Sequence, residues 1–188
     1  MSESTATTSG RIQVPSPDFW TITPFTMAAP DGWSAKQTVD HLVYLASDED
    51  PGSNCGVMWR RVSRQLSLQQ IGAMSWKATQ RTSPDATLQY SKFVRVNGIA
   101  AYLRLATISR PSGDGDDRTA CGQMYAAIHG PDFGSGRPIE LFEVVGHFDP
   151  EHPNGAGELE QILGSFEFVN VVRPDATSEA GDAESKGA

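Results

Sequence analysis

The stretch 87–148 constrains the fold more than any other part of the chain, because four strand-like segments follow one another in it with short connections. Asn97-Gly98 separates the first two segments, and this dipeptide is the one most typical of a two-residue hairpin turn. Consecutive strands joined in this way pair antiparallel, so the sequence predicts an antiparallel meander. Its expected strands are 87–97, 99–109, 118–129 and 138–148.

Shorter elements precede this meander. Alternating apolar residues over 25–29, followed by Pro30-Asp31-Gly32, predict a hairpin whose second strand spans 37–45. A third strand is predicted at 55–62, after an acidic loop rich in turn-forming residues. The expected order is therefore a hairpin and a strand before the meander.

Two helices are predicted, one on each side of the meander in the sequence. Ser67 is a typical N-cap for a helix over 68–82, which should end before Pro84. Gly72 lowers the stability of such a helix by about 1 kcal/mol relative to alanine, and a close approach to the sheet would explain its presence. The second helix, 157–166, carries a core stripe at helical spacing, made by Leu159, Ile162, Leu163 and Phe166.

The chain of 188 residues fits one α+β domain with two tails. Ser, Thr and Gly dominate 1–17, and 173–188 is acidic without apolar periodicity, so both are expected to be disordered and the domain to span 18–172. The chain has neither an apolar run long enough to span a membrane nor a secretory signal at its start. We therefore expect a cytoplasmic location.

Charge is distributed unevenly. The net charge is −8, which argues against a general nucleic-acid binder. Residues 56–110, the basic third, nevertheless carry nine basic side chains and one acidic side chain. Residues 111–168, the acidic third, carry two basic and eleven acidic side chains. The basic third either pairs with the acidic third across the sheet or forms a positive stripe for an acidic partner.

Residues that could perform catalysis or bind a metal do not form a recognisable set. Cys55 and Cys121 fit small buried side chains, and the sequence contains no nucleophile elbow or phosphate loop. The best metal candidate is 147–152, with two histidines and two carboxylates, but it is better interpreted as a polar loop before a helix. The sequence predicts neither an enzyme nor a cofactor or metal.

Apolar residues lie on both faces of the predicted meander, although an antiparallel sheet with one solvated face should alternate polar and apolar residues. Either helices cover both faces in an α/β/α sandwich, or one face stays partly open as an apolar groove. In the second case the lining and basic rim would be formed by Tyr90, Arg95, Tyr102, Arg104, Tyr125 and Phe142.

The order of elements resembles the PsbP/Mog-type α/β/α fold. The resemblance rests on the opening phrase Phe25-Thr-Met-Ala-Ala-Pro-Asp-Gly-Trp33 and the closing phrase Glu160-Gln-Ile-Leu-Gly-Ser-Phe166, and it covers about 21–170. The group includes the actinobacterial LpqN/LpqT proteins and the Eag-type chaperones of type VI secretion. The resemblance implies a fold whose members mostly bind proteins or small ligands.

These observations favour a non-catalytic binding or chaperone-like protein that engages a polypeptide through the sheet. A partner with an apolar segment flanked by acidic residues would match the two apolar faces and the basic third. The alternative is a small-ligand or lipid-binding domain of LpqN type. An open groove would favour a polypeptide, and a closed deep cavity would favour a small ligand.

Overall fold

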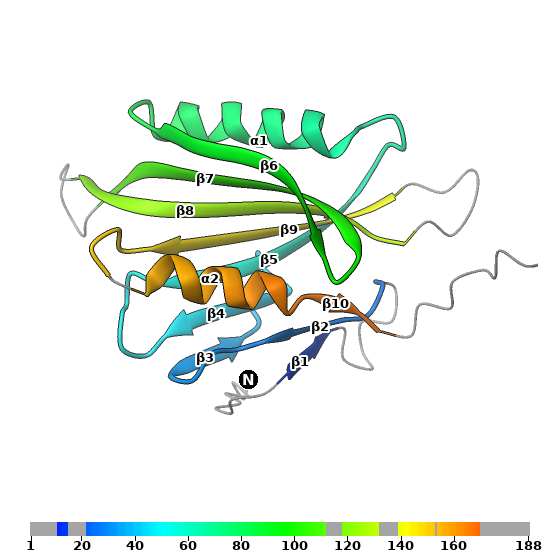
Figure 1. Cartoon of the computed structure of the whole chain (residues 1–188), viewed down its shortest axis with the longest axis horizontal. Helices are drawn as coiled ribbons and strands as arrows, with labels where there is room; N and C mark the ends of the chain where they lie inside the picture. Colours follow the sequence, from blue (N-terminus) through cyan, green and yellow to red (C-terminus); the bar gives the residue numbers. More distant parts are fainter. Residues whose placement is uncertain (1–10, 15–21, 112–117, 132–138, 153, 170–188) are drawn as a thin grey trace, which may run out of the picture.

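A computed structural model describes residues 11–14, 22–111, 118–131, 139–152 and 154–169 (Figure 1). Its main feature is a seven-stranded antiparallel sheet. In spatial order the strands are β3 (Trp33–Lys36), β4 (Val43–Ser47), β5 (Asn54–Val62), β9 (Ile139–Phe148), β8 (Arg118–His129), β7 (Ile99–Pro111) and β6 (Thr87–Val96). The α+β class and the antiparallel meander of β6, β7, β8 and β9 are confirmed.

The turn between β6 and β7 is the predicted one. Asn97 and Gly98 have φ angles of 47° and 82°, and Val96 pairs with Ile99. Two consecutive positive φ values identify a type I′ turn, whose twist matches that of the flanking strands. The side-chain amide of Asn97 also donates to the backbone oxygens of Gly164 and Phe166, at 3.2 and 2.8 Å. The hairpin is thereby fixed to the C-terminal part of the fold.

Helix α1 (Leu68–Thr82) begins and ends where the sequence predicts. Ser67 caps it and forms a capping box with Gln70, which satisfies two backbone donors of the first turn. A Cβ on Gly72 would lie 2.2 Å from Cε1 of Tyr102 in β7. The expected close approach of this helix to the sheet is therefore present. No helix in the described ranges is long and apolar enough to span a membrane.

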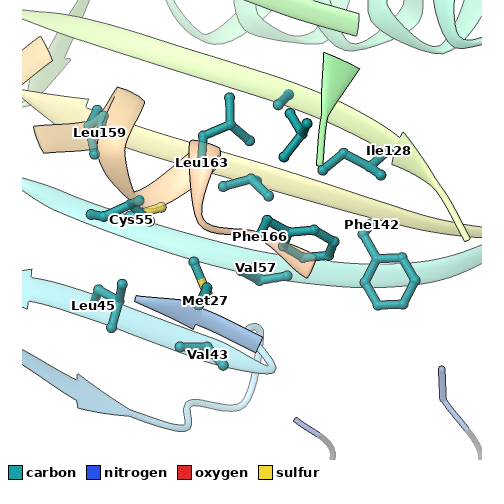
Figure 2. Packing of buried hydrophobic residues seen from close by; sticks show 14 of the residues in the cluster. Met27, Val43, Leu45, Cys55, Val57, Ile128, Phe142, Leu159, Leu163 and Phe166 are labelled. Carbon is teal, nitrogen blue, oxygen red and sulfur yellow. The ribbon is translucent and has the colours of Figure 1, made fainter. Parts of the chain in front are cut away.

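A second layer lies on the other side of the sheet. It contains α2 (Gly155–Gly164) and a small sheet in the order β1 (Arg11–Val14), β2 (Phe25–Ala28) and β10 (Glu167–Phe168). Figure 2 shows Met27 of β2, together with Leu159 and Leu163 of α2, packing on Cys55 and Val57 of the large sheet. The aromatic rings of Phe25 and Phe166 stack in the same core at 4.9 Å.

Several predicted element boundaries near the two ends of the fold are wrong. The turn at 30–32 does not join paired strands, because β2 belongs to the small sheet and β3 to the large one. The strand expected at 37–45 is replaced by β3 and β4, which flank an irregular segment. Strand β1 lies within the tail expected at 1–17, whereas the tail expected at 173–188 lies outside the described residues. The C-terminal helix ends at Gly164, so Phe166 follows it.

The two helices contact opposite faces of the large sheet, but they do not form a simple helix–sheet–helix sandwich. Leu68 and Ile71 of α1 pack with Tyr125 and Leu141, whereas α2 packs with side chains of the opposite phase. Helix α1 contacts mainly β7 and β8. Helix α2 shares its face with the small sheet, which makes that layer mixed.

Candidate binding surface

The six residues predicted to line a partner site do not share one surface. Phe142 is fully buried in the core on the α2 side, and Tyr125 and Arg104 are buried under α1 with 2% and 1% exposure. Only Arg95 is exposed, while Tyr90 and Tyr102 are half-buried. The prediction that Arg104 belongs to an exposed basic rim is wrong, because α1 covers it.

Arg104 is an interior cation with aromatic neighbours. Its guanidinium carbon lies 4.6 Å from the ring centre of Tyr125 and 5.0 Å from that of Trp76. Its Nη2 donates to Gln123 Oε1 at 3.0 Å, and its Nε has no hydrogen-bond partner. Burial lowers the pKa of Arg104, and the nearby aromatic rings partly offset the cost of removing the charge from water. Arg104 therefore links α1 to the sheet through Trp76 of α1 and through Gln123 and Tyr125 of β8.

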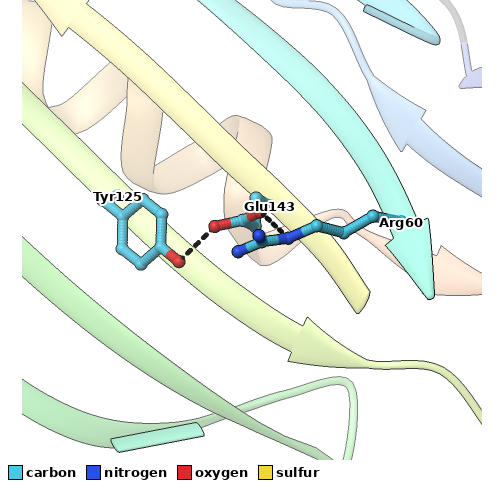
Figure 3. A network of polar contacts seen from close by, with 3 residues as sticks. All are labelled: Arg60, Tyr125 and Glu143. Carbon is cyan, nitrogen blue, oxygen red and sulfur yellow. Dashed lines mark hydrogen bonds and ion pairs between the residues drawn. The ribbon is translucent and has the colours of Figure 1, made fainter. Parts of the chain in front are cut away.

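A polar network that sequence reasoning missed continues across the same face. Figure 3 shows Tyr125 donating to Glu143 Oε1 at 2.6 Å, while Arg60 Nε contacts the other carboxylate oxygen at 2.8 Å. Farther along, His147 contacts Gln123 through Nε2 at 3.2 Å and Asn54 through Nδ1 at 3.1 Å. A sequence signal exists, since these polar residues have a common phase on otherwise apolar strands.

Burial shifts the pKa values of His147 and Cys55 away from their ordinary ranges. Burial is the main cause that lowers the pKa of His147 to about 4, and Arg110 and His41 add to it. Burial raises the pKa of Cys55 to about 12, opposite to the change that activates a nucleophilic thiol. In the described part of the chain, no three His, Cys, Asp or Glu side chains are arranged to hold a metal ion.

The outer edge of the large sheet carries exposed apolar side chains that the sequence analysis did not single out. Strand β6 is the last strand of the sheet, and Phe93 and Leu88 are 60% and 42% exposed on it. A bulge between Leu88 and Tyr90 shifts the register, so that Leu88 pairs with Ala106 and Phe93 with Tyr102. Since Ala106 and Tyr102 have the same phase on β7, both exposed side chains point to the α1 side.

Phe93 forms part of a small aromatic surface beside α1. Its ring meets that of Tyr102 edge-to-face at a centroid distance of 5.8 Å, and Tyr102 lies under Gly72. Phe93 is thus held by a half-buried neighbour while most of its own area remains exposed. Large apolar side chains in such positions are typical of interaction sites.

The same end of the molecule is basic. Neither α1 nor β6 contains an acidic residue, and together they carry Lys77, Arg81, Lys92 and Arg95. None of these four forms an ion pair in the described structure. Lys92 instead lies over the Tyr90 ring at 4.8 Å, and Arg95 donates to the Gly98 oxygen at 2.9 Å. Among the described residues of the acidic third, no carboxylate pairs with these four side chains.

A cavity on the opposite side of the sheet is too small for an organic ligand. It lies between the sheet and α2. The volume open to the centre of a water molecule is about 10 Å³, which is room for roughly one water. Its lining consists of Cys55, Met124, Ala126, Val144, Gly146, Leu159 and Leu163. This cavity does not favour the alternative of an interior lipid or small-ligand site.

Comparison with solved structures shows a PsbP-like fold. The cyanobacterial PsbP (CyanoP) of Synechocystis sp. PCC 6803 aligns with a TM-score of 0.58 at 9% identity, covering 87% of this chain and 95% of that one. LpqN, involved in cell envelope biogenesis of Mycobacterium tuberculosis, aligns with a TM-score of 0.58 at 10% identity, covering 76% and 81%. No family model and no curated protein sequence matches the chain. The predicted PsbP-like fold resembling LpqN is confirmed.

Proposed function

We propose that this protein is a non-catalytic adaptor or chaperone-like protein that binds a polypeptide at the end of the sheet formed by α1 and β6. The observation that supports this most is Phe93, which is 60% exposed on an edge strand and lies between the cations Lys92 and Arg95. An apolar anchor with a charged rim is a common arrangement in protein interfaces.

The partner should carry apolar residues next to acidic ones. Leu88 and Phe93 supply the apolar contacts, and the cations of the same strand, Lys92 and Arg95, form no ion pair with a described residue. Electrostatic attraction of this kind accelerates association and weakens as salt screens the charges. The proposed site lies at the edge of the sheet and not on the face that the sequence suggested, because Arg104 and Tyr125 are buried under α1.

Site-specific photocrosslinking tests the proposal. A photoreactive phenylalanine analogue at position 93 should form a covalent adduct with a polypeptide partner, and the yield should fall at high salt. The control is the same analogue at Val39, which is fully exposed and lies outside β6, so that exposure alone would favour adducts there. Equal adducts from both positions, or none from position 93, would contradict binding at this surface.

A further inference from the structure

The backbone of β6 has a free edge whose hydrogen-bonding groups can be assigned to particular residues. In a two-residue hairpin the residues next to the turn exchange both backbone hydrogen bonds, so Val96 and Ile99 form a hydrogen-bonded pair. Such pairs alternate with non-hydrogen-bonded ones along an antiparallel ladder. Val94 and Lys92 therefore bond to β7, while Arg95, Phe93 and Ser91 direct their N–H and C=O groups outward.

These outward groups have no partner in the described structure. Strand β6 is the last in the sheet order, and no described backbone group bonds to Ser91, Phe93 or Arg95 from the outer side. Phe93 thus presents an exposed aromatic ring and an unpaired N–H and C=O together. Unpaired edges of this length are templates for another strand unless something blocks them.

We propose that the polypeptide partner binds as an extended strand added to β6, bonded to the backbone of Ser91, Phe93 and Arg95. This inference rests on the proposed function and specifies its mode. Main-chain bonds would supply affinity, and side chains of alternate phase would supply specificity. The strand would place apolar residues beside Leu88 and Phe93 on the α1 side.

Charge defines the kind of strand that fits. Lys92 and Arg95 point to opposite faces of the sheet, three positions apart, or roughly 10 Å along the strand. Two acidic residues three positions apart in the added strand would also point to opposite faces and would face one cation each. A second copy of this chain fits poorly, because pairing β6 with β6 would bring the cations of two basic strands together.

Nuclear magnetic resonance with a defined peptide tests the mode even when binding is weak. The probe is a ten-residue peptide of alternating Val and Thr in which Asp and Glu replace two residues three positions apart, used in both sequence directions. Binding should slow hydrogen exchange at the amides of Ser91, Phe93 and Arg95. It should have little effect on Lys92 and Val94, whose amides already bond to β7. The same peptide with Lys at both acidic positions should bind several-fold more weakly at low salt.

Two controls separate strand addition from contact through side chains. The first is the same peptide N-methylated at every internal residue, which keeps its side chains but donates no backbone hydrogen bond. The second is Ser91→Pro, which removes one outward N–H at an edge position where proline is tolerated, compared with Ser91→Ala. N-methylation of the peptide and Ser91→Pro should each weaken binding at least tenfold, whereas Ser91→Ala should not. The spectrum of each variant away from β6 should stay that of the parent.

The outcomes distinguish the inference from the proposed function. If the N-methylated peptide binds as well as the parent and both perturb Phe93, strand addition is overturned and polypeptide binding stands. If no peptide perturbs β6 or α1, both are overturned. A concentration-dependent dimer whose formation protects the same three amides without peptide would identify a second copy as the occupant, and would overturn the acidic partner.

Discussion

The side-chain amide of Asn97 donates a 2.8 Å hydrogen bond to the backbone oxygen of Phe166, which links the tip of the β6–β7 hairpin to the segment after α2. The same residue has a φ of 47°, a conformation that asparagine tolerates better than other side chains except glycine. Asn97 therefore has two separable roles, one in the turn and one in the attachment of the hairpin.

Substitutions at Asn97 should separate these roles. Asn97→Gly keeps the turn but loses the bonds to Gly164 and Phe166, so it should lower the free energy of unfolding by about 1–2 kcal/mol. Asn97→Ala adds the cost of a left-handed alanine and should lower it by about 1 kcal/mol more. Urea unfolding measures both. Equal values for the two variants would contradict a contribution from the turn conformation.

The contact between Gly72 and Tyr102 predicts a change of sign. Alanine normally stabilises a helix relative to glycine by about 1 kcal/mol. In this protein Gly72→Ala should destabilise by about 1–3 kcal/mol, because the new Cβ would overlap the Tyr102 ring. In a Tyr102→Ala background the same change should become neutral or stabilising. A double-mutant cycle on thermal unfolding checks this, and additive effects would rule out the contact.

In the Tyr125–Glu143–Arg60 network, the buried hydrogen bond from Tyr125 to Glu143 should contribute more to protein stability than the ion pair of Arg60. Tyr125→Phe removes a buried donor to a carboxylate and should cost about 1.5–3 kcal/mol. Arg60 is half-exposed and can return to water, so Arg60→Ala should cost less than about 1 kcal/mol. Chemical unfolding of the two variants under identical conditions provides the comparison. A larger effect of Arg60→Ala would mean that the ion pair dominates.

Stability should fall in mild acid because His147 is held neutral. Its pKa is about 4 in the folded protein and 6.5 in the reference state, so between these values the unfolded chain binds more protons. The stabilisation is complete above pH 6.5 and is lost as the pH falls toward 4. Arg110 and His41 oppose a charge there, while Gln123 and Asn54 bond the neutral ring.

The measurement compares pH 7.5 with pH 5.0 in the parent and in His147→Gln. The parent should lose about 2 kcal/mol more than the variant over this interval, because the pKa difference applies only to the histidine. Using the difference between two proteins removes the contribution of the carboxylates that both share. Parallel pH profiles would show that His147 titrates normally.

Local sequence signals predicted the parts of the fold that local chemistry determines. Asn97-Gly98 defines its turn because few residues accept positive φ, and Ser67 starts α1 because its side chain satisfies a backbone donor. Strands β1 and β10 were missed, since four and two residues form strands only by pairing with β2. Their pairing depends on distant parts of the chain, which local periodicity does not report.

The binding surface was harder to predict, for two reasons. An arginine is ordinarily exposed, and only the position of Trp76 on α1 over Arg104 explains why this one is buried. The bulge between Leu88 and Tyr90 has no proline or glycine to indicate it, and simple alternation would put Leu88 and Phe93 on opposite faces. The structure places these two side chains on the same face of β6, and this placement supports the proposal of a site at the sheet edge.

The two arginines that the sequence grouped together should behave differently in binding. Arg104→Met replaces a buried cation lacking a full set of partners with an apolar side chain of similar length. It should change stability by less than about 2 kcal/mol and leave partner binding unaltered.

Lys92→Glu combined with Arg95→Glu reverses two exposed charges next to Phe93 in β6. This double change should slow association at least tenfold at low salt, with little effect at high salt. Stopped-flow binding of the crosslinked partner or the acidic peptide, at two salt concentrations, measures both variants. A matched double reversal, Lys36→Glu with Arg61→Glu at exposed cations of β3 and β5, changes the net charge by the same amount and controls for it. If that control slows association equally, attraction by the whole protein rather than by the β6 edge governs binding, and the site at Lys92 and Arg95 is wrong.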